Sequence, residues 1–410
     1  MKNKKIKKHY KTKRKKEAKK KEEKRIILKK SYKKKGKKDK AKEILTKIGD
    51  KKINIKIIGV GGAGGNMVSR MKEKRIEGVE FVALNTDIQS LRLTKADVKI
   101  QLGKNTCRGL GAGMDPDKGK EAAQESLEEI EKVINNTDLV FLVCGLGGGT
   151  GSGAAPVIAN LLKQKNILTV AFVTRPFSFE GEKRQEVAEE AWQRLYNEVD
   201  SIVTIYNDRV FNVIEEKTPI LEAFSKIDDI LRMGVKGIVD LIFYPGLINL
   251  DYANIKTILT NAGVTLMGIG KATGENRARK AAQMAISSPL LDVSIDGAKK
   301  ILFNISGGKD LTLVEIHDAS RIITQTASKD AQVIFGTSFD NDLKQNEVKV
   351  TVIAGLGGEE FKELYEPTLP LATKVPVESP SETEKEEESG EEFEKELEIP
   401  AFLRKQRKNK

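Results

Sequence analysis

Two glycine-rich segments carry the clearest chemical signal in this sequence. The first, Gly59-Val60-Gly61-Gly62-Ala63-Gly64, lies between a strand pattern and a helix pattern and fits the G-x-G-x-x-G spacing of phosphate-binding turns. The second, from Gly145 to Gly153, has six glycines in nine residues and also follows a strand and opens a helix. Glycine lets a backbone approach a phosphate, and a helix N-terminus supplies N–H donors and partial positive charge. Two such loops at one sheet edge predict a site for a nucleoside triphosphate.

The first loop by itself also fits two alternatives. It suits a dinucleotide-dependent oxidoreductase, because Asp87 lies about where such enzymes place a ribose-binding acid. It also suits a tight packing turn without a ligand. Neither alternative needs the second loop, whose glycines carry a large cost in folding entropy. No G-K-[ST] lysine follows either loop, so we expect backbone N–H groups to hold the phosphates in place of a P-loop lysine.

The elements that must position these loops alternate between buried strands and helices. Runs rich in Val, Ile and Leu predict parallel strands covered on both faces, at residues 55–60, 80–84, 138–144 and 167–173. Helix patterns follow the two loops, at residues 65–74 and 152–164. This half of the chain therefore predicts a Rossmann-like α/β domain.

A long helix and a second α/β unit are expected next. The helix pattern runs from Pro219 to about Phe243 with few breaks. Beyond it, strands at 266–270, 301–305 and 349–354 alternate with helices that start near Arg277 and Leu313. From Gly358 onward the composition changes to Glu, Pro, Ser and Thr, which predicts a linker too polar to pack.

The net charge of +13 on these 410 residues is distributed unevenly. Residues 1–52 hold 27 Lys and Arg against six acidic residues, whereas residues 378–398 hold eleven Glu and two Lys. Residues 53–377 are left with a net charge of −4. The basic pI therefore belongs to an N-terminal arm whose composition predicts disorder, and the body of the protein is mildly acidic.

Composition also excludes several classes of protein. No apolar run approaches the ~18 residues that cross a bilayer, and the basic N-terminus lacks the apolar core of a signal peptide. Cys107 and Cys144 cannot form a disulfide scaffold and lack zinc-site spacing. His9 and His317 are the only histidines, so a catalytic triad or a His-rich metal site is not expected. We expect a soluble protein of a reducing compartment, with no metal held by protein ligands alone.

Motifs across most of the chain identify a resemblance. The run Gly147-Gly148-Gly149-Thr150-Gly151-Ser152-Gly153 is the tubulin signature in the form used by FtsZ proteins, the bacterial cell-division GTPases. Further motifs follow in the order of that family: Asn85-Thr86-Asp87, Arg108 to Gly113, Pro176 to Gly181, Asn207-Asp208-Arg209 and Asn249-Leu250-Asp251. The sequence thus resembles the FtsZ family over about residues 53–358 and the final dozen.

The resemblance implies a tubulin-like α/β fold divided into six parts along the chain. These are a disordered arm (1–52), a GTP-binding domain (53–218), a central helix (219–245), a GTPase-activating domain with the catalytic loop (246–358), an acidic disordered linker (359–397) and a partner-binding peptide (398–410). It also implies GTP and GDP as ligands, with Mg²⁺ brought by the nucleotide.

The resemblance assigns GTP-binding roles to fifteen residues. The phosphate loops are Gly62, Ala63, Gly64, Gly65 and Asn66, with Gly149, Thr150 and Gly151. Ala112 and Gly113 correspond to a γ-phosphate-sensing loop, and Glu180 and Arg184 to the pair near the ribose. Asn207, Phe224 and Asp228 are expected at the guanine. Taken without the motifs, Glu180 and Arg184 would be a surface salt bridge and Phe224 would be core packing.

A carboxylate at the base accounts for a preference for guanine. It accepts hydrogen bonds from both N1–H and the exocyclic amine of guanine, whereas adenine has no donor at N1. Phe224 precedes Asp228 by one helical turn and would supply a stacking surface.

The loop after the long helix resembles the one that enters the nucleotide site of the next subunit and completes catalysis there. Asn249, Asp251 and Asn254 are its candidate catalytic residues. The family normally has a second aspartate where this chain has Asn254. Asn can hold a water molecule but cannot act as a base, and a general base contributes about 10²–10⁴-fold. Two alternatives follow: a GTPase of reduced activity, or a GTP-gated polymer with little turnover.

The resemblance implies a homopolymer of head-to-tail protofilaments in the cytoplasm, at the division site beneath the inner membrane. The C-terminal peptide is expected to bind membrane-tethering and regulatory division proteins through Ile399, Pro400, Phe402, Leu403 and Arg404. The N-terminal arm lies outside the resemblance. Its alternatives are an anionic lipid surface, nucleic acid, the acidic linker of the same chain, or no partner beyond solvation.

Overall fold

The computed structural model describes residues 53–357, except 213, 216, 244–247, 249, 288–294, 340–342 and 345. The predictions for the arm (1–52), the linker (359–397) and the C-terminal peptide (398–410) lie outside the described residues, as does the candidate Asn249. The boundaries proposed for these parts stay predictions.

Ten strands form one mixed sheet in the order β3-β2-β1-β4-β5-β6-β7-β10-β8-β9. The strands are β1 (Ile55–Val60), β2 (Val79–Asn85), β3 (Val98–Gln101), β4 (Leu139–Gly145), β5 (Leu168–Arg175), β6 (Ser201–Tyr206), β7 (Gly263–Thr273), β8 (Lys300–Gly307), β9 (Gln332–Phe339) and β10 (Glu347–Gly355). Strands β1 to β6 pair only in parallel, which confirms the parallel sheet expected for the first half.

The nucleotide-binding half is built on strands buried on both faces. All eight residues of β5 are buried, and so are the first six of β4. Such strands require helices on each side, because a sheet buried on both faces must be covered by packed layers. The covering helices are α2 (Gly61–Glu73), α3 (Ile88–Leu93), α4 (Pro116–Glu125), α5 (Leu127–Ile134), α6 (Gly149–Gln164) and α7 (Glu182–Tyr196).

The two glycine loops are themselves the first turns of helices. Helix α2 begins at Gly61 and α6 at Gly149. From the sequence we expected these helices to begin later, at about residue 65 and at residue 152. The prediction was wrong because glycine has a low helix propensity, and tertiary packing overrides it here. A Cβ atom on Gly64 would lie 2.5 Å from the carbonyl oxygen of Val143 on β4, so only glycine lets α2 approach the sheet this closely.

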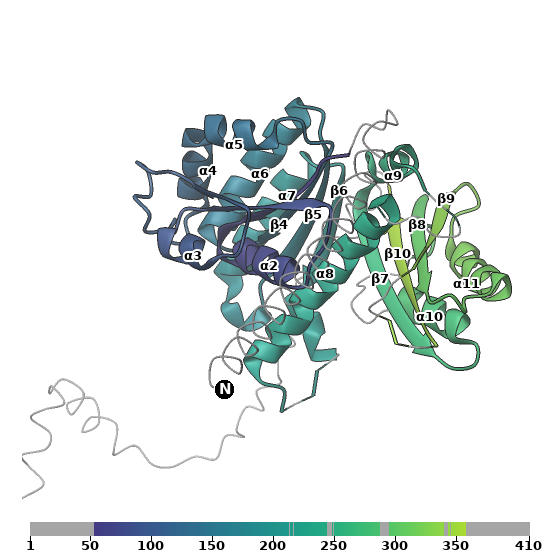
Figure 1. The fold of residues 1–410 in the computed structure, drawn as a ribbon. Coiled ribbons are helices and arrows are strands. Elements are labelled where there is room, and N and C mark those ends of the chain that lie inside the picture. Colours follow the sequence, from purple (N-terminus) through teal and green to yellow (C-terminus); the bar gives the residue numbers. More distant parts are fainter. Residues whose placement is uncertain are drawn as a thin grey trace, which may run out of the picture. The chain divides into compact units, whose positions relative to one another are not determined.

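The long helix α8 (Ile220–Phe243) lies between the two halves of the sheet (Figure 1). Its predicted extent is confirmed to within one residue. Gly234 and Gly237 of α8 face Met267 of β7 and Thr351 of β10, and a Cβ atom on them would lie 1.8 Å and 3.0 Å from those side chains. The helix therefore packs on strands of the second half, and it also contacts α2 of the first.

The second α/β unit continues the same sheet. Ser201–Val203 of β6 pair in parallel with Gly263–Thr265 of β7, so β7 extends the sheet of the first half. Strand β10 then runs antiparallel to both β7 and β8. The sequence predicted a second unit but not this continuity, because pairing partners cannot be inferred from strand patterns alone. Helices α9 (Tyr252–Leu259), α10 (Arg277–Ile286) and α11 (Leu313–Thr326) complete the unit, and the last two start where predicted.

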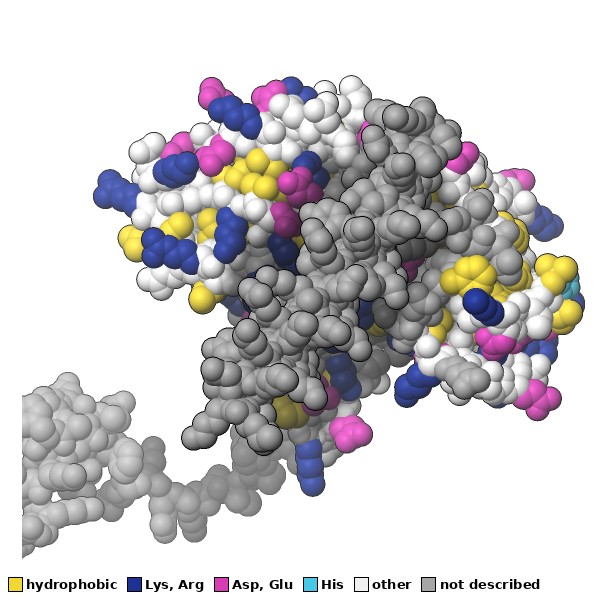
Figure 2. Space-filling view, in the orientation of Figure 1, with side chains coloured by type: hydrophobic (Ala, Val, Ile, Leu, Met, Phe, Trp, Pro, Cys, Tyr) yellow, Lys and Arg dark blue, Asp and Glu magenta, His cyan; other side chains and the backbone are white. Residues whose placement is uncertain are grey.

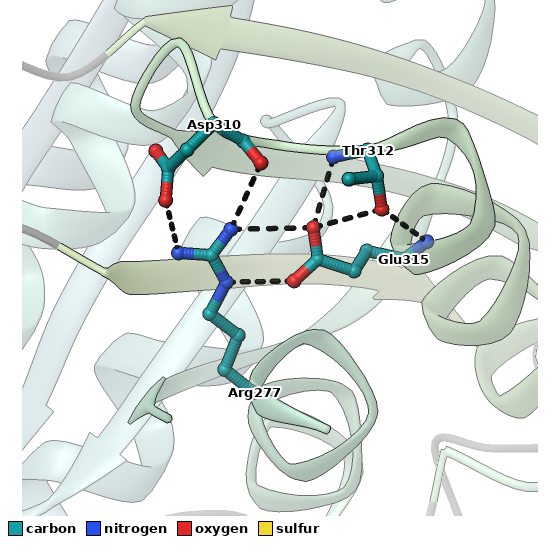
Figure 3. A network of polar contacts seen from close by, with 4 residues as sticks. All are labelled: Arg277, Asp310, Thr312 and Glu315. Carbon is teal, nitrogen blue, oxygen red and sulfur yellow. Dashed lines mark hydrogen bonds and ion pairs between the residues drawn. The ribbon is translucent and has the colours of Figure 1, made fainter. Parts of the chain in front are cut away.

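A buried arginine ties α10 to the start of α11 (Figure 3). The guanidinium of Arg277, which is 6% exposed, donates through Nε and Nη2 to the Glu315 carboxylate and through Nη1 to Asp310. Glu315 also accepts hydrogen bonds from the backbone N–H and the hydroxyl of Thr312, the N-cap of α11. Arg277 holds the pKa values of Glu315 and Asp310 below their usual range through these hydrogen bonds.

The surface of the described body shows no segregation of charge on the face drawn in Figure 2. Lys and Arg side chains alternate there with Asp and Glu side chains. No helix in the part of the chain that the structure describes is long and apolar enough to cross a membrane.

Removing the charge of Glu315 is expected to destabilise the second half. Glu315→Gln keeps the side-chain shape but leaves the buried Arg277 with a weaker partner, which should cost about 2 kcal/mol of unfolding free energy at pH 7. Because the folded-state pKa of Glu315 is lowered, its stabilisation is present above the unfolded value near ~4.3 and is lost as the pH falls through the folded value.

Urea denaturation followed by circular dichroism at pH 7 and at lower pH measures both effects. The matched control is Glu275→Gln, because Glu275 is exposed on the loop before α10. Equal stability of the Glu315→Gln and Glu275→Gln variants would contradict the role assigned to the network.

Candidate functional site

The two glycine loops meet at the carboxyl ends of adjacent parallel strands. Val60 of β1 pairs with Cys144 of β4. Strand β1 runs directly into the glycine-rich start of α2, and three residues separate the end of β4 from the glycine-rich start of α6. Gly61 has a φ of +73°, and a Cβ atom on it would lie 3.1 Å from the backbone nitrogen of Gly151. The first turns of α2 and α6 are therefore in backbone contact, as a site for one phosphate chain requires.

A cavity of about 700 Å³ opens over this contact. Its volume is within the range of small-molecule sites. Nine of the fifteen predicted GTP-binding residues line it: Gly62, Ala63, Gly149, Thr150, Gly151, Glu180, Arg184, Asn207 and Phe224.

The phosphate end of the cavity is built from backbone donors. Neither α2 nor α6 has a side-chain N-cap or an acidic residue in its first turn. The first four N–H groups of each helix have no acceptor within the helix, and both helix dipoles place partial positive charge here. Among the described residues that line the cavity there is no lysine, as the missing P-loop motif predicts. Two helix N-termini thus supply the positive potential for an anion.

Side-chain hydroxyls hold the loops in shape. The hydroxyls of Thr86, after β2, and Thr150, in the first turn of α6, lie 2.6 Å apart. The Ser152 hydroxyl accepts a hydrogen bond from the Gly147 N–H at 2.9 Å. These two contacts fix the second loop against β2 and against its own first turn.

Asp87 has a structural role at the cavity rim. It caps α3 by accepting from the Gln89 N–H at 2.8 Å and from the Ser90 hydroxyl at 2.5 Å. The hydrogen bond from Ser90 lowers the pKa of the Asp87 carboxyl. Its carboxylate is therefore committed to the helix start and is not free to serve as the ribose-binding acid of a dinucleotide enzyme.

Glu180 and Arg184 form an ion pair that also lines the cavity. One Glu180 oxygen pairs with Arg184, and the other accepts from the Phe177 N–H at 2.9 Å. The pair therefore has the geometry of a salt bridge between Arg184 of α7 and a residue just before that helix, while facing the site. Both interpretations of these residues are compatible with the structure.

An unsatisfied amide marks the other end of the cavity. Asn207 follows β6 and is 9% exposed, and its Oδ1 atom is buried with no hydrogen-bond partner. A buried polar atom of this kind calls for a ligand or water. Phe224 of α8 is 40% exposed and packs edge-on against Phe177, with ring centroids 5.6 Å apart. An aromatic face and an open amide suit a planar base with hydrogen-bonding edges.

Six predicted GTP-binding residues do not line the cavity. Gly64 and Gly65 are buried, and side chains on them would meet Val143 and Thr94 respectively. Asn66 is exposed on the next turn of α2. Ala112 is buried and Gly113 exposed, although their neighbours Gly111 and Met114 line the cavity.

Asp228 is the sixth of these residues, and it pairs with a cation of another helix. Its Oδ2 atom lies 2.9 Å from Nε of Arg70 on α2. Burial raises the pKa of the Asp228 carboxyl to about 6 against the opposing effect of Arg70.

The described residues of the candidate catalytic loop do not line this cavity. Asp251 is exposed and caps α9, its carboxylate accepting from the Asn254 N–H at 2.8 Å. Asn254 is partly exposed in the first turn of that helix. Neither lines the cavity.

Sequence reasoning missed several residues of the cavity wall. Outside the two glycine loops, the wall includes residues to which no GTP-binding role was assigned: Asn85, Thr86, Asp87, Ser90, Gly111, Met114, Thr174, Pro176, Phe177, Phe179 and Ile220. A signal existed for the first three, because they end or directly follow β2, whose carboxyl end lies beside that of β1. Ser90 and Ile220 gave no such signal.

Family models match both halves of the chain. The Tubulin/FtsZ family GTPase domain matches residues 54–215, and the FtsZ family C-terminal domain matches residues 263–357. These matches cover the two sides of the long helix α8.

Solved structures are similar over the same region. An empty FtsZ dimer from M. jannaschii is 44% identical, with a TM-score of 0.72 over 77% of this chain and 91% of that one. The GTPγS-bound protofilament of CetZ2 from Haloferax volcanii is 22% identical, with a TM-score of 0.66 over 75% of this chain and 94% of that one. GDP-bound monomeric CetZ1 from the same organism is 23% identical, with a TM-score of 0.65 over 76% and 97%. The last two share the fold.

Together with the two helix N-termini facing one cavity, the matched models and the 44% identity establish that this chain belongs to the Tubulin/FtsZ family of GTPases, which bind GTP and GDP.

Proposed function

We propose that this chain binds and hydrolyses GTP and polymerises head to tail into filaments that form the cell-division ring during septation. The main support is one cavity, which two helix N-termini without side-chain caps and the unsatisfied amide oxygen of Asn207 face together. Such a space offers donors for a phosphate chain at one end and an acceptor for a base at the other.

Different residues would contact the phosphates, the ribose and the base of the nucleotide. The first-turn N–H groups of α2 and α6 would bind the β- and γ-phosphates, with the Thr150 hydroxyl beside them. The Glu180–Arg184 pair would contact the ribose and the adjoining phosphate. Asn207, Phe224 and Asp228 would recognise guanine, the base whose N1–H and amine both donate.

A magnesium ion would bind at this site only together with the nucleotide, whose phosphates would supply ligands to the ion. Within the described residues, no three acidic, histidine or cysteine side chains lie close enough to form a metal site. Mg²⁺ sites with few protein ligands are completed by substrate phosphates. The ion would neutralise phosphate charge, while the chain's own backbone donors orient the phosphates.

The catalytic water requires a group that the cavity lacks. Of the described residues that line it, Asp87 and Glu180 are the only acids, and both carboxylates are engaged in hydrogen bonds. Asp251 is exposed at the start of α9, so a head-to-tail neighbour would bring it to the γ-phosphate. A heterologous contact that does not close gives a filament. The similar FtsZ structure from M. jannaschii is a dimer.

A GTP-gated polymer with little hydrolysis is the second candidate. It is favoured by Asn254, whose amide occupies the position where the resemblance expects a second aspartate. The Asn254 side chain makes no hydrogen bond to another described residue, so its amide can hold a water molecule in the assembled site.

The peptide with Ile399, Pro400, Phe402, Leu403 and Arg404 would dock on membrane-tethering and regulatory division proteins. The protein would then act in the cytoplasm at the division site, beneath the membrane. The basic arm would bind anionic lipid or nucleic acid. Binding to anionic liposomes and to DNA, measured over a range of salt concentrations for the chain with and without residues 1–50, would distinguish these two partners.

GTP, but not GDP or ATP, is expected to make the full-length chain sediment in a pelleting assay, with phosphate released in parallel. If a neighbour completes the site, phosphate release per subunit rises with protein concentration. The matched variant Gly62→Asp puts a carboxylate into open space at the N-terminus of α2, where it stabilises the helix but repels phosphate, so both signals should vanish. Sedimentation that does not depend on the nucleotide would contradict the proposal.

Asn254→Asp is expected to raise GTP turnover in the polymer on the order of 10²-fold, because it restores a candidate base. An acidic residue in the first turn of α9 also favours the helix dipole, so the fold should tolerate it. The control is Asp251→Asn, which keeps a good N-cap but removes the charge and should lower turnover without preventing assembly. Unchanged turnover in the Asn254→Asp polymer would show that this residue does not limit hydrolysis.

A further inference from the structure

A single ion pair joins α2 and α8 beside the base end of the cavity. Arg70 Nε lies 2.9 Å from Asp228 Oδ2, and the two side chains are 35% and 13% exposed. Arg70 follows Asn66 by four residues on α2, and Asp228 follows Phe224 by four residues on α8. Residues four apart lie on the same helix face, so the pair lies one turn beyond the aromatic residue that lines the cavity.

The surroundings of Asp228, apart from Arg70, disfavour the ionised form of its carboxyl group. Burial, with a smaller contribution from Asp229 on the same helix, raises its pKa to about 6 even with Arg70 present. Arg70 is the charge that favours the ionised form. A carboxyl group that takes up a proton becomes a donor at one oxygen, and it then no longer matches the two donors of guanine.

We propose that Arg70 is a positioning residue for base recognition, which keeps the Asp228 carboxylate ionised and oriented toward the guanine edge. This inference rests on the proposed function, in which Asp228 reads the base. Arg70 contacts the carboxylate through Oδ2, and a carboxylate has about four acceptor sites, so it can pair with the arginine and still accept from guanine. Guanine is neutral, so the negative charge buried with it still needs the arginine as its counter-charge.

The arrangement makes guanine affinity depend on a residue outside the cavity. Neither Arg70 nor Asp228 is among the cavity-lining residues, but Asp228 lies one turn beyond Phe224, which is, so the effect of Arg70 on the nucleotide would pass through Asp228. The consequence is specific: loss of Arg70 changes the pH dependence of guanine binding and leaves phosphate binding intact.

Equilibrium binding of diphosphates to the full-length chain tests this, because GDP avoids hydrolysis. Displacement of fluorescent methylanthraniloyl-GDP by GDP, IDP and ADP is measured from pH 5.5 to 8.5. Wild-type affinity for GDP should fall as the pH drops through about 6. In Arg70→Gln the fall should begin about one unit higher. About a tenth of the carboxyls would then be ionised at pH 6 against half in wild type, which is about a fivefold loss of affinity.

Matched variants separate positioning from charge and folding. Arg70→Lys keeps the charge and should restore most of the wild-type profile. Lys74→Gln removes an exposed cation from the end of α2 that does not pair with Asp228 or act on its pKa, and it should match wild type at every pH. ADP affinity should show no shift in any variant. A GDP profile of Arg70→Gln that coincides with those of wild type and Lys74→Gln overturns the inference.

The variant Asp228→Asn distinguishes failure of this inference from failure of the proposed base recognition. It should bind GDP weakly at all pH values and lose the preference for GDP over IDP, which lacks the exocyclic amine. If Asp228→Asn keeps that preference, the base-reading assignment fails and the role of Arg70 fails with it. If Asp228→Asn loses the preference while Arg70→Gln behaves as wild type, only the role of Arg70 is overturned.

Discussion

The backbone contact between the first turns of α2 and α6 is the constraint on which the rest of the site depends. Gly61 adopts a positive φ that side chains rarely allow, and a Cβ atom on it would lie only 3.1 Å from the Gly151 nitrogen, so the two helix N-termini share one space. Because β1 and β4 are adjacent and parallel, the sheet fixes this approach before any ligand arrives. The positive potential of the cavity therefore comes from backbone and requires no lysine.

Helix α8 gives the cavity its second end. It contributes Phe224 to the wall and Asp228 to the ion pair with Arg70, and it packs through Gly234 and Gly237 on strands of the other half. The same helix thus touches the base site and the unit that follows the candidate catalytic loop. Nucleotide binding and the proposed assembly therefore have one rigid element in common.

Features that depend on short-range sequence pattern and on the properties of glycine could be predicted from the sequence. The loops at Gly61 and Gly149 were located correctly, since strand-glycine-helix transitions have few other uses. Their helical character was missed, because the close approach of Gly64 to Val143 involves residues far apart in the sequence. The Arg70–Asp228 pair and the β6–β7 pairing were unpredictable for the same reason: no local pattern records which distant elements meet.

In the candidate catalytic loop, one residue has a structural role in the fold and another does not. Asp251 caps α9 through the Asn254 N–H, so helix stability accounts for its presence even without hydrolysis. The Asn254 side chain has no such duty toward the described residues, so the identity of that residue affects chemistry more than fold. Retention of Asp251 is therefore weak evidence for turnover. The amide at position 254 bears more directly on the rate of the proposed hydrolysis, because the described fold does not use that side chain.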